Sequence, residues 1–257
     1  MSIVLYEVHQ RIAYITLNRP EKRNALNDQM ASALTEKFLQ AEADNDVKVI
    51  VLKANGDVFC AGADLEYLQS LQNNSYDENL KDSKKLMNLF RTIYCLKKVV
   101  IAQVNGHAIA GGCGLVSVCD FAFSVDTANF GYSEVKIGFV PAIVMDFLVK
   151  KIGEARAKEM LITGTFIKAK EAMKWNLINE SIEEGNLEEI VTQFAQKLCV
   201  NNSGNSMELI KKLFSESDGK TFEERLINAA NVNALARSTE DCKKGISSFL
   251  NKQKLEW

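Results

Sequence analysis

Two segments that lie 50 residues apart carry small residues in a pattern that could stabilise negative charge. Residues 49–65 (VIVLKANGDVFCAGADL) and 99–115 (VVIAQVNGHAIAGGCGL) align without a gap. Each copy predicts an apolar strand, an Asn-Gly turn and a run of small residues that opens a helix. Such a helix start leaves backbone N–H groups free and lets another group approach closely, so two stacked copies could direct two N–H groups at one carbonyl oxygen. A second interpretation is that the glycines only allow tight packing of strand against helix.

A carboxylate that could transfer protons follows in the segment 129–142 (NFGYSEVKIGFVPA), where Glu134 stands among apolar residues. Apolar surroundings raise the pKa of a carboxylate, so this group could exchange protons near neutral pH. The competing interpretation is a glutamate in the first turn of a helix, with Ser133 as its N-cap. His107 follows an Asn-Gly turn and is typical of a structural turn residue, and the sequence contains no GxSxG motif.

The elements that must position these groups alternate between strand and helix. Hydrophobic periodicity predicts, in chain order, a hairpin from 3–8 and 12–17, a helix from Asn27 or Asp28, a strand at 47–53, a helix at 77–96, a strand at 99–104, and mostly helix beyond 142 except near 178–182. This is an α/β pattern. A repeat near 50 residues further predicts stacked units, none of which buries its own apolar face alone.

Composition excludes several classes of protein. A chain of 257 residues with 47% hydrophobic and 25% charged residues is typical of one large globular domain with a small appendage, and not of a disordered or fibrous protein. The net charge of −2 gives no global positive field for nucleic acid or an anionic membrane. Six cysteines without a CxxC pair, and only two histidines, argue against a metal site and favour a reducing, cytoplasmic location. The uncharged run 99–119 contains an Asn-Gly turn and four glycines, which argue against a membrane span.

Four motifs, in this order and at this spacing, resemble the crotonase (enoyl-CoA hydratase/isomerase) superfamily: LNRPEKRNALN, VFCAGADL, VNGHAIAGGCGLVSVCDF and FGYSEVKIGFVP. The resemblance runs from about residue 3 to residue 253. It implies an α/β fold, a crotonase-like spiral of ββα units over residues 1–200, with a helical C-terminal trimerisation region over 201–257. It also implies a homotrimer or a dimer of trimers. The implied substrate is an acyl-CoA thioester, with no separate cofactor because coenzyme A is part of that substrate.

The same resemblance implies roles for individual residues. The oxyanion donors of the family fall on the backbone N–H groups of Ala63 and Gly111, and an acid/base glutamate falls on Glu134. The residues that match the family's substrate-binding positions are Lys22, Arg23, Ala25, Ala61, Asp64, Leu65 and Gly112. Phe249 and Lys252 resemble an FxxK element that a neighbouring subunit lends to the coenzyme A site.

One position departs from the family pattern. Hydratases of this family resemble one another in having two glutamates, and the first of these falls on Gly114, which can neither hold water through a side chain nor give a proton. One carboxylate suffices for an isomerase, because a single base can take a proton from Cα of a 3-enoyl thioester and return it at Cγ. The sequence therefore favours isomerisation in fatty acid metabolism.

The alternative is a lyase, an enoyl-CoA hydratase that replaces the missing glutamate. The variant run FVPAIVM resembles hydratases, including ones similar to methylglutaconyl-CoA hydratases. Tyr132 or Cys113 could hold the water there, or Asp146 could act as the second carboxylate. Two other classes remain open from the sequence: a non-catalytic trimer that binds coenzyme A, and a hydrolase of related fold that would need His107.

Overall fold

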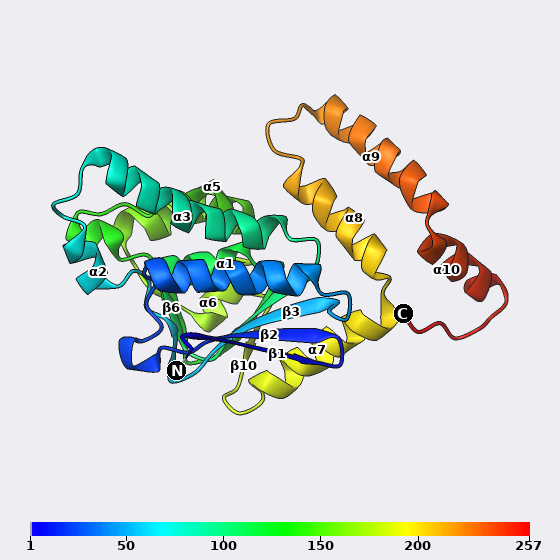
Figure 1. The fold of residues 1–257 in the computed structure, drawn as a ribbon, viewed down its shortest axis with the longest axis horizontal. Coiled ribbons are helices and arrows are strands. Elements are labelled where there is room, and N and C mark those ends of the chain that lie inside the picture. Colours follow the sequence, from blue (N-terminus) through cyan, green and yellow to red (C-terminus); the bar gives the residue numbers. More distant parts are fainter. Residues whose placement is uncertain (1) are drawn as a thin grey trace.

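The computed structural model describes residues 2–257, in which the strands form two sheets (Figure 1). The larger sheet has the order β1-β2-β3-β5-β7-β10, and its strands are β1 (Val4–His9), β2 (Ile12–Leu17), β3 (Val49–Ala54), β5 (Val99–Val104), β7 (Phe121–Val125) and β10 (Glu180–Ile182). The pair β1-β2 is an antiparallel hairpin, as predicted, and every other neighbouring pair in this sheet is parallel. All six residues of β2 and of β5 are buried, so this sheet forms the centre of the core.

The smaller sheet carries the second strand of each repeat. Its order is β4-β6-β8-β9, with β4 (Val58–Cys60), β6 (His107–Ile109), β8 (Asn129–Gly131) and β9 (Ile167–Lys168). The strands β4, β6 and β8 are parallel neighbours, whereas β9 closes the sheet as an antiparallel strand. The carboxyl ends of β4, β6 and β8 therefore lie at one edge of the sheet.

The two sheets are linked by three successive units, and the sequence repeat predicts only two of them. The first is β3-β4 followed by α2 (Leu65–Ser70), the second is β5-β6 followed by α4 (Gly111–Val118), and the third is β7-β8 followed by the 3₁₀ helix η2 (Glu134–Ile137). The third unit has no Asn-Gly turn and ends in a single short turn of helix. Its sequence therefore does not resemble the first two units, although its strands take the same places in the two sheets. The predicted spiral of ββα units is confirmed, with one more turn than the sequence predicts.

Helices lie on both sides of the larger sheet. Figure 1 shows α1 and α3 on one side of this sheet and α7 on the other. Besides α2, α4 and η2, the helices of residues 2–201 are η1 (Pro20–Lys22), α1 (Asp28–Ala43), α3 (Tyr76–Cys95), α5 (Ala142–Thr163), α6 (Ala169–Lys174) and α7 (Leu187–Asn201). Asn27 caps α1 by accepting a hydrogen bond from the N–H of Met30 at 2.9 Å, and Ser75 with Glu78 forms a capping box at the start of α3. These caps explain why the predicted helices begin where they do.

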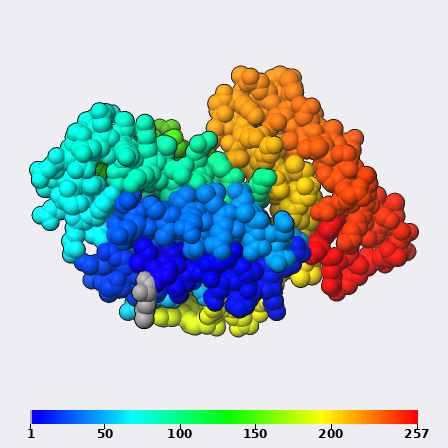
Figure 2. Space-filling view, in the orientation of Figure 1, coloured from blue at the N-terminus to red at the C-terminus, as the bar shows by residue number. Residues whose placement is uncertain are grey.

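The last three helices project from the core as an arm (Figures 1 and 2). They are α8 (Gly204–Ser215), α9 (Phe222–Ser238) and α10 (Glu240–Leu250), and none of their residues is buried. Several large apolar side chains of the arm are exposed, including Phe222 at 67% and Leu250 at 73%. Trimerisation through this arm and a domain boundary at residue 200 stay predictions. None of the helices in residues 2–257 combines the length and the apolar character needed to cross a membrane.

Candidate active site

Three parallel strands of the smaller sheet deliver three groups to one cavity. Ala63 follows the end of β4, Gly111 follows the end of β6, and Glu134 follows the end of β8. All three residues line a cavity of about 270 Å³. The structure thus brings together the three residues for which the sequence predicts catalytic roles, because neighbouring parallel strands end at the same edge.

The two small-residue turns pack directly against each other. Gly62 has φ of +89°, and a Cβ added to it would lie 2.5 Å from Cβ of Ala110 and 2.9 Å from the carbonyl oxygen of Ile109. Ala110 itself has φ of 53° and ψ of −123°, a backbone conformation that L-residues rarely adopt. Within residues 2–257, no protein acceptor takes the hydrogen of the N–H of Ala63 or of Gly111. The glycines therefore allow close packing, as the second interpretation predicts, and the same packing leaves two N–H groups free at the cavity. That these groups stabilise negative charge stays a prediction.

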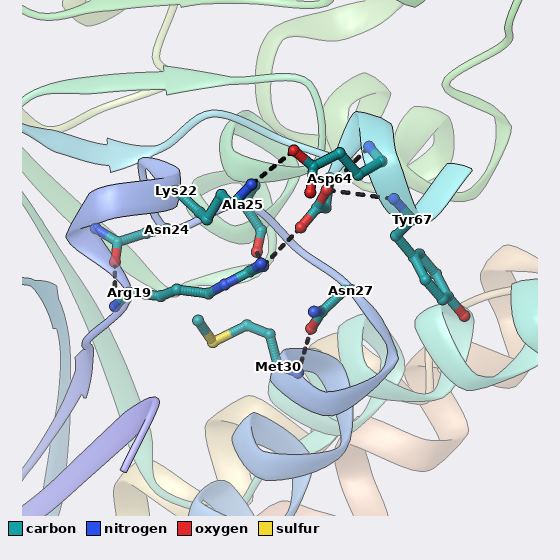
Figure 3. Close-up of polar contacts among 9 residues, drawn as sticks. Arg19, Lys22, Asn24, Ala25, Asn27, Met30, Asp64 and Tyr67 are labelled. Carbon is teal, nitrogen blue, oxygen red and sulfur yellow. Dashed lines mark hydrogen bonds and ion pairs between the residues drawn. The ribbon is translucent and has the colours of Figure 1, made fainter. Parts of the chain in front are cut away.

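A buried ion pair fixes the turn that carries Ala63 (Figure 3). The carboxylate of Asp64 accepts a hydrogen bond from Nη1 of Arg19 at 2.7 Å, and the two side chains are 7% and 17% exposed. The same carboxylate caps α2 by accepting from the N–H groups of Glu66 and Tyr67. Burial alone would raise the pKa of Asp64, but the hydrogen bonds from Arg19 and from these N–H groups lower it below its ordinary value. The carboxylate thus remains charged and is already satisfied inside the protein.

Backbone hydrogen bonds hold this turn from the other side. The N–H of Leu26 donates to the carbonyl of Gly62 at 2.7 Å, and the N–H of Asp64 donates to the carbonyl of Leu26 at 2.9 Å. Arg19 is not predicted as a functional residue from the sequence, because its partner lies 45 residues further along the chain. Its position shows that it orients the turn rather than the substrate directly.

Glu134 lies at the first position of η2, with one carboxylate oxygen in an apolar environment. Its Oε2 atom is buried, and no group in residues 2–257 donates a hydrogen bond to it. Burial raises the pKa of Glu134 above its ordinary value of 4.5, and a hydrogen bond from its own backbone N–H offsets part of that shift. Ser133 stands at the N-cap position of η2 and Glu134 in its first turn, as the competing interpretation predicts, but the Ser133 side chain makes no capping hydrogen bond. An unpaired, partly buried carboxylate is suited to proton transfer near neutral pH.

Comparison with known families decides the identity of this site. A family model described as Enoyl-CoA hydratase/isomerase matches residues 7–257. The chain belongs to the enoyl-CoA hydratase/isomerase family. This places it in the crotonase superfamily and identifies it as an enzyme of that family, which argues against both the non-catalytic trimer and the hydrolase. His107 is exposed, lies outside the cavity lining and accepts a hydrogen bond from the N–H of Asn129 through Nδ1.

Relatives of this hydratase/isomerase cover nearly the whole chain. A Thermus thermophilus protein named as a candidate enoyl-CoA hydratase is 39% identical over 242 residues, which are 94% of this chain and 95% of that protein. The Escherichia coli protein named 2,3-dehydroadipyl-CoA hydratase is 30% identical over 254 residues, with coverage of 98% and 97%. The crystal structure of an enoyl-CoA hydratase of Mycobacterium smegmatis superposes with a TM-score of 0.93 at 30% identity, covering 100% of this chain and 99% of that chain.

The position of the missing family glutamate is filled by apolar side chains. A Cβ added to Gly114 would lie 2.4 Å from Cγ1 of Val144 and 3.1 Å from Cε1 of Phe90. A glutamate at this position in the enoyl-CoA hydratase/isomerase fold therefore has no room here. Glu134 is consequently the only member of the family's glutamate pair that this enzyme retains.

None of the three residues expected to replace that glutamate lines the cavity. Tyr132 and Cys113 are fully buried in the core, where burial raises the pKa of the Cys113 thiol to about 12. Asp146 is exposed on α5, outside the cavity lining. The cavity instead contains polar residues from α1, α2 and α3 that no sequence motif predicts: Asp28, Tyr67, Asp82 and Lys85. Because these come from three helices, only the packing of the helices brings them together.

The residues predicted to bind coenzyme A fall into three groups. Ala61 and Leu65 line the cavity beside Ala63. Ala25, Asp64 and Gly112 are buried and do not line the cavity. A Cβ on Gly112 would lie 2.3 Å from the carbonyl oxygen of Cys60, so this glycine is required for packing. The remaining residues are exposed away from the cavity: Lys22 and Arg23 on the loop after β2, and Phe249 and Lys252 on the arm. Lys22 is paired with Glu66 at 2.7 Å (Figure 3).

Proposed function

We propose that this enzyme converts a 3-enoyl-CoA to a 2-enoyl-CoA, with Glu134 as the only acid/base group of the proton transfer. The observation that carries the proposal is the meeting of two free N–H groups and one unpaired carboxylate on a single cavity. The filled space beside Gly114 supports a reaction that needs one carboxylate rather than two.

The reaction follows from the polarity of the thioester. The N–H groups of Ala63 and Gly111 would hold the thioester oxygen and stabilise the negative charge that develops there. The ionised carboxylate of Glu134 removes a proton from Cα, and the electron pair of that C–H bond delocalises onto the thioester oxygen. Glu134 then returns the proton to Cγ, and the double bond moves from C3–C4 to C2–C3. A pKa raised towards neutral lets the same group act as base and then as acid.

Hydration of a 2-enoyl-CoA is the second candidate reaction. It is favoured by the names of full-length relatives, the 2,3-dehydroadipyl-CoA hydratase of Escherichia coli and the crotonyl-CoA hydratase of Syntrophomonas wolfei. A hydratase similar to those of methylglutaconyl-CoA falls in the same class. Such a reaction requires a polar group that holds the water, in addition to Glu134.

Binding of coenzyme A and assembly belong to the same proposal. Ala61 and Leu65, at the cavity, would contact the pantetheine arm, while Lys22 and Arg23 offer positive charge for the phosphates. Phe249 and Lys252 are exposed on an arm that projects from its own core, which suits residues that complete the site of a neighbouring subunit. We therefore propose a homotrimer or a dimer of trimers in which the arms carry the contacts.

The test is mass-resolved turnover of a 3-enoyl-CoA and a 2-enoyl-CoA by the wild type and by Glu134→Gln. Conversion of the 3-enoyl to the 2-enoyl thioester, reduced about a thousandfold or more in the variant, is the expected result. Binding of a saturated acyl-CoA should be unchanged, since glutamine keeps the shape of the side chain. A variant that turns over as fast as the wild type would refute the role of Glu134.

A further inference from the structure

Besides Glu134, the cavity is lined by a second set of polar side chains, which comes from α2 and α3. Tyr67 lies on α2, two residues after the helix begins, and its hydroxyl donates a hydrogen bond to the carboxylate of Asp82 on α3. Both residues line the cavity that contains Ala63, Gly111 and Glu134. Both residues are half-buried.

Tyr67 is fixed relative to the N–H group of Ala63. The N–H of Tyr67 donates to the carboxylate of Asp64 at 3.3 Å, and Asp64 is held in turn by Arg19 (Figure 3). Asp64 directly follows Ala63 in the chain, so one carboxylate places both the oxyanion donor and the tyrosine. The backbone of Tyr67 is thus held by the same carboxylate as the turn of Ala63, and its hydroxyl is held separately by Asp82.

The hydroxyl of Tyr67 is committed as a donor but free as an acceptor. Burial, and then the hydrogen bond to Asp82, raise the pKa of Tyr67 well above its ordinary value, so the phenol stays protonated at neutral pH. Its hydrogen points to Asp82, and its oxygen lone pairs remain available to accept a hydrogen bond from a water molecule.

The other polar groups of the cavity do not offer this combination. Lys85 and Asp28 form an ion pair at 2.6 Å, and their side chains are 47% and 39% exposed, which places them at the rim. Gly114 has no side chain, and Tyr132, Cys113 and Asp146 do not line the cavity. Asn27, Ser83 and Ser133 also line the cavity, but none of their side chains donates a hydrogen bond to a carboxylate within residues 2–257. Among the cavity-lining residues that the structure describes, Tyr67 with Asp82 is the pair that joins a hydroxyl, which can accept a hydrogen bond from water, to a carboxylate that can take up the proton.

We propose that Tyr67, held by Asp82, is a second catalytic residue that holds the water which adds to Cβ of a 2-enoyl thioester, so that the site hydrates 2-enoyl-CoA as well as isomerising 3-enoyl-CoA. This inference rests on the proposed function, because it uses the same oxyanion hole and the same Glu134.

The step is balanced in protons and electrons. The oxygen of the water forms a bond to Cβ, and the π electrons of the C2–C3 double bond move to give an enolate whose oxygen is held by Ala63 and Gly111. The water proton passes to the oxygen of Tyr67 while the tyrosine proton passes to Asp82. Protonated Glu134 then delivers its proton to Cα. Exchange with solvent returns the proton from Asp82 to Glu134.

The experiment compares two reactions in three variants. Tyr67→Phe keeps the ring and removes the hydroxyl, Asp82→Asn keeps the shape and removes the proton acceptor, and Tyr94→Phe is the control. Tyr94 is a half-buried tyrosine on the same helix as Asp82, but it lies outside this cavity. We expect Tyr67→Phe to lower kcat for hydration of a 2-enoyl-CoA about a hundredfold or more, and to leave isomerisation of a 3-enoyl-CoA within about threefold. Asp82→Asn should lower hydration selectively as well, and Tyr94→Phe should change neither reaction.

Several outcomes would overturn the inference. A wild type that isomerises but adds no water refutes it while leaving the proposed isomerase intact. Equal losses of both reactions in Tyr67→Phe and in Asp82→Asn would assign the pair a structural role. If Tyr67→Phe does not fold, Asp82→Asn provides the same comparison. Full activity of Glu134→Gln in both reactions refutes the proposed function instead.

Discussion

Val144, near the start of α5, occupies the space that a side chain on Gly114 of α4 would need. The gap between an added Cβ at 114 and Cγ1 of Val144 is 2.4 Å, far below a normal contact. Val144 and Phe90 thus fill the space beside Gly114, the position at which the family resemblance implies a glutamate. The wall is apolar at this point, so a second polar group must come from elsewhere in the cavity.

This packing predicts a specific stability defect. Gly114→Ala is expected to lower the free energy of unfolding by about 1–3 kcal/mol, because the added methyl group overpacks a buried position. Gly204→Ala is the matched control, since its added Cβ would meet only the Lys48 side chain at an ordinary 3.5 Å. Chemical denaturation of both variants measures the difference. Val144→Ala should recover part of the loss in the Gly114→Ala background although it destabilises the wild type. Equal stability of the two glycine variants would contradict the crowding.

The raised pKa of Glu134 predicts how activity and stability depend on pH. Isomerisation needs the ionised carboxylate, so kcat should rise with pH through a midpoint above the ordinary value of 4.5. Stability should change in the opposite sense. The folded state holds the Glu134 proton to a higher pH than the unfolded state, so the wild type should lose stability relative to Glu134→Gln as pH rises through the folded-state pKa.

Unfolding of the two proteins from about pH 4 to 8 checks this sign. Below the ordinary pKa both side chains are neutral, and the two proteins should be nearly equal in stability. A difference that opens as the pH falls, instead of as it rises, would show that the pKa of Glu134 is lowered in the folded state.

Removal of the ion pair between Arg19 and Asp64 should lower both the stability of the protein and the polarisation of the thioester carbonyl of a bound acyl-CoA. Arg19→Met leaves the carboxylate of Asp64 buried without its partner and is expected to cost about 3 kcal/mol. Lys22→Met is the control in the same loop, because its pair with Glu66 is exposed and is worth no more than about 1 kcal/mol.

A spectroscopic measurement separates an effect on the orientation of the Ala63 N–H from an effect on stability. The carbonyl stretching frequency of a bound acyl-CoA thioester should shift less in Arg19→Met than in the wild type, because the N–H of Ala63 is no longer held in place. Measurements at a temperature where the variant is fully folded avoid the stability effect. An unchanged frequency would mean that the ion pair stabilises the turn without orienting the donor.

The exposed apolar side chains of the arm predict an oligomer. We expect the wild type to sediment as a trimer or hexamer, and Phe222→Asp to shift it towards monomer, because the aspartate would place a charge in the contact. Tyr76→Asp is the control, since Tyr76 is 79% exposed on the core rather than on the arm. A wild type that sediments as a monomer at micromolar concentration would refute the proposed assembly and the lending of Phe249 and Lys252 to a neighbour.

The sequence by itself determined the local elements and the chemistry of their ends. Hydrophobic alternation predicted the hairpin of β1 and β2, and the cap at Asn27 predicted the start of α1. The repeat predicted two stacked ββα units whose small-residue helix starts could leave N–H groups free, and the family resemblance assigned these groups to Ala63 and Gly111. These predictions succeed because the alternation of buried and exposed residues, the turns and the helix caps all depend on residues a few positions apart.

Only the tertiary structure decided which strand and helix ends meet at the cavity. The third unit has no repeat motif, yet the parallel pairing of β8 with β6 places Glu134 beside the two N–H groups. The ion pair of Arg19 with Asp64, the wall formed by Val144 against Gly114, and the pair of Tyr67 with Asp82 each join residues between 15 and 45 positions apart. Contacts over such separations arise from the packing of whole strands and helices, and local sequence patterns carry no trace of them.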